Sequence, residues 1–159
     1  MAPKPILDLD AIDLETVIAD PNDIRKVLAQ RGRLYMLDGI LHEDKEGQVL
    51  VGYKDIRSDD WWCDDHFPGR PVFPGALLIE SAAQLASYDY IRNRATRKDG
   101  NVGFGGVDST RFRNAVLPDS RVIFVAKLTR ARGTMFRYDT QGFVDGKIVF
   151  ESHIMGVVF

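Results

Sequence analysis

The segment from about Gly75 to Arg94 constrains the fold most, because as a helix it is apolar around nearly its whole circumference. A helix turns once in about 3.6 residues, so only side chains spaced three or four apart share a face. The apolar side chains of this segment do not fall on one stripe, and they are Leu77, Leu78, Ile79, Ala82, Ala83, Leu85, Ala86 and Tyr88. Such a helix has to be buried on every side. The rest of the chain must therefore surround it.

Most of the remaining sequence has the alternating pattern of β-strands. The alternation is clearest over residues 122–128, and Asp145-Gly146 between two such runs is a strong signal for a tight hairpin. Arg132-Gly133 is a weaker signal of the same kind. The expected strands span residues 34–42, 48–57, 102–107, 111–116, 121–130, 134–144 and 147–158. They predict an antiparallel meander.

One buried helix and an antiparallel sheet fit together when the sheet wraps around the helix and covers its full circumference. The expected fold class is therefore α+β, with the sheet around one long central helix. A chain of 159 residues is long enough for one domain and too short for two ordinary ones. We expect a single domain over residues 1–159 with an N-terminal helical extension at about 1–32, in which Asp20-Pro21-Asn22-Asp23 forms a helix cap.

Composition excludes several classes of protein. The net charge of −2 gives no overall attraction to nucleic acid, and no apolar run reaches the ~18 residues that a membrane span needs. The lone Cys63 cannot form an internal disulfide, and the N-terminus lacks the apolar core of a secretory signal. We therefore expect a soluble cytoplasmic protein that neither binds nucleic acid nor spans a membrane.

The sequence gives little sign of a metal or cofactor site. Cys63 and His66 lie in a loop with several aspartates, but no second Cys or His stands at ligand spacing. The glycine-rich segment 103–106 lacks the strand, turn and helix context of a nucleotide-binding loop. We expect neither a metal nor a cofactor.

Two ionisable side chains stand out against this background. Glu80 lies within the apolar helix, where a carboxyl group either finds a partner or has a raised pKa that suits a general acid. Gln84 lies one turn further on the same face and can hydrogen-bond it. His66, in the preceding loop, is of the residue type best suited to remove a proton near neutral pH, although a single loop histidine is more often structural. With the backbone N–H of Gly75 to polarise a carbonyl, these groups suit β-elimination beside a thioester.

A long motif surrounds these residues and resembles the signature of the β-hydroxyacyl-ACP dehydratases. It runs Asp65-His66-Phe67-Pro68-Gly69-Arg70-Pro71-Val72-Phe73-Pro74-Gly75, followed by Leu77-Leu78-Ile79-Glu80 and Ala83-Gln84. The likeness extends loosely from about Ile24 to Met155 and so covers most of the chain. It implies a hotdog fold and the conversion of β-hydroxyacyl-ACP to trans-2-enoyl-ACP, in fatty acid synthesis or in a specialised lipid pathway. The implied partner is acyl carrier protein.

The resemblance also implies how the site is built. Members of the family are obligate dimers, usually assembled into a hexamer as a trimer of dimers, and each site draws on two subunits. By motif position His66 is the base and Glu80 of the other chain is the acid. The N–H of Gly75 holds the thioester carbonyl, the carbonyl of Val72 accepts a hydrogen bond from His66, and Gln84 is a supporting, water-ordering residue. Glutamate at position 80 favours the dehydratases over the related dehydratase/isomerases, which use aspartate there.

The chain departs from the family pattern in two places. Residues 29–33 read Ala-Gln-Arg-Gly-Arg, where the family usually has Pro-His-Arg-x-Pro. Residues 102–104 read Val-Gly-Phe, where many members have a tyrosine pair near the acyl tunnel. Both departures leave the catalytic positions intact and bear on acyl chain length and pathway.

Acyl carrier proteins are acidic, so a basic rim near the motif is expected to dock them. The docking candidates are Arg70, Arg111, Arg113 and Arg121. For each of them an ordinary surface ion pair is the alternative interpretation.

Two other functions remain open at this stage. A hotdog acyl thioesterase would use the same fold and an acidic residue to activate water, but the Phe-Pro-Gly motif argues against it. A non-catalytic acyl-binding hotdog subunit would not need both His66 and Glu80, which this chain retains.

Overall fold

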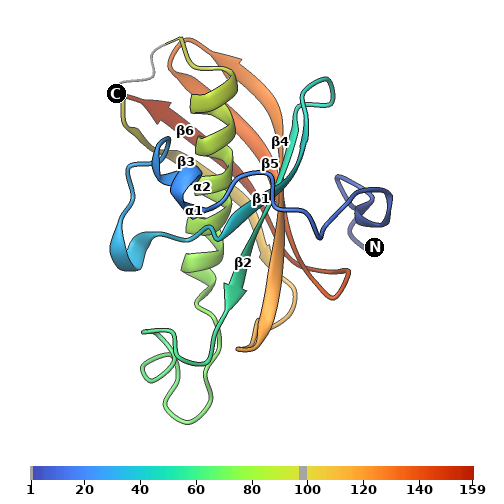
Figure 1. Cartoon of the computed structure of the whole chain (residues 1–159), viewed down its shortest axis with the longest axis vertical. Helices are drawn as coiled ribbons and strands as arrows, with labels where there is room; N and C mark the ends of the chain where they lie inside the picture. Colours follow the sequence, from blue (N-terminus) through green and yellow to red (C-terminus); the bar gives the residue numbers. More distant parts are fainter. Residues whose placement is uncertain (1, 97–99) are drawn as a thin grey trace.

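The computed structural model describes residues 2–96 and 100–159 and confirms the expected α+β hotdog architecture. One antiparallel sheet, in the order β1-β2-β4-β5-β6-β3, curves around the long helix α2 (Gly75–Asn93), as Figure 1 shows. The strands are β1 (Gly39–Asp44), β2 (Val49–Ile56), β3 (Val102–Phe112), β4 (Ser120–Arg132), β5 (Met135–Val144) and β6 (Lys147–Val158). Strand β3 lies at one edge of the sheet, beside β6.

Helix α2 is buried as its all-round apolar pattern predicts. Every residue from Ser81 to Tyr90 is buried, including polar side chains. The inner face of the sheet supplies the covering groups; for example, the ring of Phe136 on β5 stacks on Tyr90 with centroids 4.1 Å apart. Among the described residues no helix, α2 included, is long and apolar enough to cross a membrane.

One expected strand begins later than its sequence pattern suggests. The prediction of a strand over residues 34–42 is wrong at its start, because the strand begins only at Gly39. Residues Gly32–Leu34 form a 3-10 turn instead, and Gly32 enters it with a φ of +61°. A left-handed φ of this kind is easy for glycine and takes the backbone out of the extended conformation.

The separate strands expected at 102–107 and 111–116 are one strand, so that prediction is also wrong. β3 runs to Phe112, and its pairing with β6 is irregular over residues 104–106 and 108–111. Each irregularity interrupts the strict alternation that a strand shows in sequence. Beyond Phe112 the chain leaves the sheet and passes beside the loop that contains His66, where the Phe73 N–H donates to the Val116 carbonyl at 2.8 Å.

The N-terminal extension packs on the outer face of the sheet. Helix is limited there to a 3-10 turn η1 (Leu9–Ala11) and α1 (Pro21–Arg25), and α1 begins at the predicted capping box of Asp20. Gln141 on β5 fixes the extension by accepting from the Ile6 N–H at 2.7 Å. The extension contributes the apolar side chains of Ile6, Leu7, Leu9, Ile12 and Leu14 to a second core cluster on β1, β2, β4 and β5. This cluster explains why β2 is buried on both faces.

A buried carboxylate near the end of α2 ties the helix to the sheet. Asp89, which is 2% exposed, accepts from the hydroxyl of Tyr138 at 2.5 Å and from the side-chain amide of Asn93 at 2.8 Å. The guanidinium of Arg94 lies 3.4 Å from the same carboxylate. Burial and the charge of Asp89 together raise the pKa of Tyr138, so its hydroxyl stays protonated and donates. The sequence analysis did not single out Asp89.

Replacing Tyr138 by Phe should lower the free energy of unfolding by about 1–3 kcal/mol, because a buried carboxylate loses a donor. Urea unfolding followed by circular dichroism measures the change. Tyr35→Phe is the matched control, since the buried Tyr35 hydroxyl has no partner within the described residues and its removal should be neutral or slightly stabilising. Equal unfolding midpoints for the two variants would show that the Asp89 contact contributes nothing.

Candidate active site

The ring of His66 is held by backbone atoms of its own loop, between β2 and α2. Its Nδ1 lies 2.7 Å from the carbonyl oxygen of Val72. A carbonyl only accepts, so Nδ1 carries a proton and Nε2 of the neutral ring keeps its lone pair. The Val72 N–H donates back to the His66 carbonyl at 2.8 Å, and the Phe67 ring stacks on the imidazole at 4.1 Å. The expected contact to Val72 is present, and Nε2 can act as a base.

Glu80 is a half-buried carboxyl group with a single side-chain partner. Gln84 donates from Nε2 to Glu80 Oε1 at 2.8 Å. The same amide is fixed from the other side, because its Oε1 accepts from the Met36 N–H at 2.9 Å and its Nε2 donates to the Leu34 carbonyl at 2.6 Å. Burial raises the pKa of Glu80, and the Gln84 hydrogen bond opposes that rise. A carboxyl group in this setting is more readily protonated, as a general acid requires.

Gly75 is the first residue of α2 and borders the same cavity as His66. Within the described residues no carbonyl accepts from its backbone N–H. A Cβ on Gly75 would lie 2.9 Å from the ring of Phe112, so a larger residue would displace that ring. The N–H lies at the positive end of the helix dipole and is free to polarise a carbonyl oxygen.

Within one chain His66 and Glu80 line different cavities. His66, Gly75 and Phe112 border a cavity of about 460 Å³. Glu80 borders another, of about 100 Å³, together with residues 102–104. The two sets of lining residues have no member in common. A single chain therefore holds His66 and Glu80 in separate cavities, one beside each end of β3.

The described residues offer no metal site. No group of three or more His, Cys, Asp or Glu side chains suited to a metal ion occurs in residues 2–96 and 100–159. Cys63 donates from Sγ to the Arg57 carbonyl at 3.3 Å, and burial raises the pKa of its thiol. Asp59 pairs with the Arg57 guanidinium at 2.9 Å. Cys63 and Asp59 are therefore engaged by partners within their own loop.

The structure divides the docking candidates, which are Arg70, Arg111, Arg113 and Arg121. Arg113 donates to Glu151 at 2.6 Å, and Arg121 donates to Asp55 at 2.7 Å, so these positive charges are largely neutralised. Arg70 and Arg111 are exposed and pair with no carboxylate in the described part of the chain. They are the more available of the candidates.

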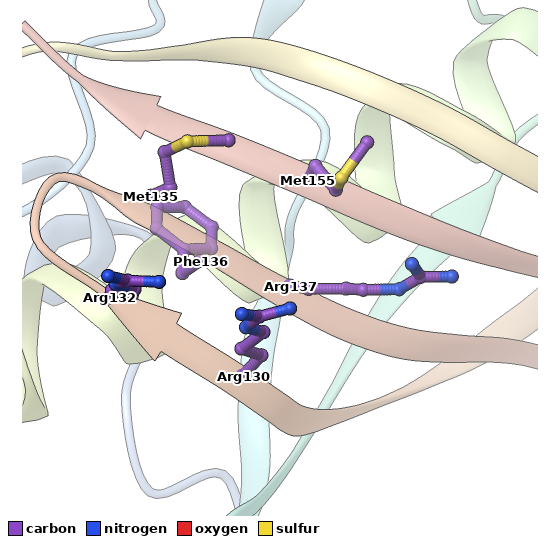
Figure 2. Close-up of a pocket in the computed structure, with 6 residues that line it drawn as sticks. All are labelled: Arg130, Arg132, Met135, Phe136, Arg137 and Met155. Carbon is purple, nitrogen blue, oxygen red and sulfur yellow. The ribbon is translucent and has the colours of Figure 1, made fainter.

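A second basic surface was missed by sequence reasoning. Arg130, Arg132 and Arg137 surround a cavity of about 340 Å³ together with Met135 and Met155, as Figure 2 shows. Arg137 pairs with a carboxylate of β3 at 3.2 Å, whereas Arg130 and Arg132 have no such partner among the described residues. We call these residues the arginine–methionine patch. The sequence feature that could have predicted this patch is the pair Arg130 and Arg132 near the end of β4. Residues two apart on a strand point to the same face of the sheet.

Comparison with known proteins adds an independent line of evidence. Residues 28–153 match the model of a family described as FabA-like domain. The chain is 32% identical over 142 residues to the 3-hydroxyacyl-[acyl-carrier-protein] dehydratase FabZ of Campylobacter jejuni strain 81-176, covering 87% of this chain and 97% of that protein. It is 33% identical over 142 residues to the bifunctional enzyme LpxC/FabZ of Chlorobaculum tepidum, covering 89% of this chain and 30% of that larger enzyme.

A solved structure supports the fold alone. The dehydratase heterocomplex ApeI:P from Xenorhabdus doucetiae contains a chain that superposes with a TM-score of 0.69 at 12% identity. The match covers 86% of this chain and 90% of that chain.

Replacing Gln84 by Met should raise the pKa of Glu80 further, because the hydrogen bond that favours the carboxylate form is lost while burial remains. A pH titration of the Glu80 carboxyl carbon by NMR measures the midpoint. Gln141→Met, which alters the outer face of the sheet, is the control and should leave that midpoint unchanged. A midpoint that stays the same or falls in the Gln84 variant would contradict the assigned role of its amide.

Proposed function

Because the chain belongs to the FabA-like family, we propose that it removes water from 3-hydroxyacyl groups on acyl carrier protein and so forms trans-2-enoyl-ACP. The likeness to FabZ at 32% identity over 87% of the chain supports this hydro-lyase activity. The roles of the residues are inferred from two cavities that we interpret as half-sites, one bordered by a histidine with a free ring nitrogen and the other by a half-buried carboxyl group. Because the proposed substrate is carried by acyl carrier protein, we propose that the enzyme acts in the cytoplasm.

The two half-sites would combine if β3 paired with β3 of a second copy. This edge strand exposes large apolar side chains, with Phe104 52% and Phe112 54% exposed. Exposed edges of this kind favour pairing with another strand. Antiparallel self-pairing centred on Val107 would set Phe112 opposite the partner subunit's Val102. Since Phe112 borders the His66 cavity and Val102 borders the Glu80 cavity, His66 would then face the partner's Glu80.

In this arrangement the elimination is an acid–base reaction. Nε2 of His66 takes the proton from C2 of the acyl group, and the electron pair forms the C2–C3 double bond. The N–H of Gly75 stabilises the charge that develops on the thioester oxygen. The C3–O bond breaks as the partner's Glu80 protonates the departing hydroxyl, which leaves as water. Gln84 then stabilises the carboxylate until it regains a proton.

The carrier would dock through complementary charge. The arginine–methionine patch combines apolar surface with the guanidinium groups of Arg130 and Arg132, which have no carboxylate partner among the described residues. This combination suits an acidic protein that also presents apolar side chains. Arg70 and Arg111 form a second docking candidate, favoured by their unpaired charge next to the residues that border the His66 cavity.

His66→Ala and Glu80→Gln should each lower turnover by ~10²-fold or more, as loss of a general base or acid does. The assay follows reversible hydration of a trans-2-enoyl thioester, with circular dichroism to check folding. Near-normal turnover in either variant would overturn the assignment of that residue.

The same two variants test whether the site spans two chains. Mixed, partly unfolded and refolded together, they form some dimers that hold one intact His66–Glu80 pair. Part of the activity should return, whereas each variant refolded alone should stay inactive. A mixture as inactive as its components would place the site within one chain.

The double variant Arg130→Glu/Arg132→Glu should lower kcat/KM for carrier-linked substrate by about tenfold or more while sparing a pantetheine thioester, because only the carrier meets the patch. Arg70→Glu/Arg111→Glu makes the same change in charge and is the matched comparison. If only Arg70→Glu/Arg111→Glu lowered kcat/KM for the carrier-linked substrate selectively, the carrier would dock at Arg70 and Arg111 instead. Equal losses on both substrates would remove the docking role from either pair.

A further inference from the structure

A smaller cavity adjoins the one beside Glu80. The polar or half-buried residues Glu80, Gln84, Ser87 and Ile91 recur at helical spacing and so follow one face of the helix. The first cavity, of about 100 Å³, and the second, of about 40 Å³, are both bordered by Gln30, Ser87 and Val102, so they lie next to each other. A channel that leads away from Glu80 along the helix would pass between these shared residues.

Gln30 brings an unpaired polar atom to the narrow part of this channel. Its Oε1 is buried and has no hydrogen-bond partner within the described residues. The backbone around it is fixed, because Arg31 donates to the carbonyls of Leu28 at 2.6 Å and of Gln30 itself at 2.8 Å. Buried polar atoms are nearly always paired, so an unpaired one that borders a cavity points to contact with water or ligand. Gln30 also lies in the segment where the chain departs from the dehydratase signature.

Ser87 borders the same two cavities as Gln30 and is 7% exposed. At about 1.5 Å of rise per residue, Ser87 lies roughly 10.5 Å further along the helix than Glu80. A short acyl group held at Glu80 would end before this point, whereas a long one would pass between the two polar side chains.

We propose, on the premise of the dehydratase function above, that Gln30 and Ser87 form a polar constriction in the acyl channel that selects short 3-hydroxyacyl groups over long hydrocarbon ones. A long hydrocarbon chain removes water from the side-chain Oε1 of Gln30 and from the Ser87 hydroxyl, and it offers neither group a hydrogen bond in return. A short chain leaves both groups hydrated. Gln30 and Ser87 are therefore specificity-determining residues, remote from the reacting atoms.

The test compares 3-hydroxybutanoyl, 3-hydroxyhexanoyl and 3-hydroxydodecanoyl groups, all on acyl carrier protein so that docking is constant. The wild type should show a kcat/KM about tenfold or more higher for the butanoyl than for the dodecanoyl substrate. The double variant Gln30→Leu/Ser87→Ala should raise the dodecanoyl value by about tenfold or more and change the butanoyl value by less than about threefold. Each single variant is measured as well, with its melting temperature.

Ser81→Ala is the matched control, because Ser81 is a buried serine of α2 that bonds the Leu77 carbonyl at 2.8 Å and borders neither cavity. It should leave the ratio of the two kcat/KM values unchanged. A wild type that prefers the dodecanoyl substrate, or a folded double variant with the wild-type ratio, overturns the constriction while the dehydratase function stands. A wild type that dehydrates none of the substrates rejects the proposed function itself.

Discussion

The burial of α2 on every side is the constraint on which the rest of the structure depends. The sheet curves around this helix, and the edge strand beside β6, which also contacts the helix, is β3. The start of β3 thereby borders the Glu80 cavity, and its end borders the His66 cavity. The separation of the acid from the base within one chain thus follows from the same packing that buries the helix.

Two carboxyl groups on α2, those of Asp89 and Glu80, differ in the hydrogen-bond donors that surround them. Asp89 is surrounded by donors from Tyr138, Asn93 and Arg94, so its charge is stabilised and it fastens the helix to the sheet. Glu80 accepts from Gln84, the one side-chain donor that the described residues give it, and burial raises its pKa. A raised pKa favours the protonated form of a carboxyl group, as a general acid requires.

The two faces of the sheet are used differently. The inner face covers α2 and the channel beside Glu80, while part of the outer face is covered by the N-terminal extension, which Gln141 fastens to β5. The uncovered part of the molecule includes the arginine–methionine patch (Figure 2). Strand alternation makes this division possible, since neighbouring residues on one strand serve the core and the surface in turn.

Sequence by itself determined the helix, the meander, the hairpin at Asp145-Gly146, and the pairing of His66 with Val72 and of Glu80 with Gln84. These depend on local periodicity, turn chemistry or a motif of contiguous residues. It did not determine the continuous β3, the partners of Arg113 and Arg121, the buried Asp89, or the cavities that Gln30 and Ser87 both border. Those features join residues distant in sequence, and only the folded chain brings such residues into contact and shows which charges are already neutralised.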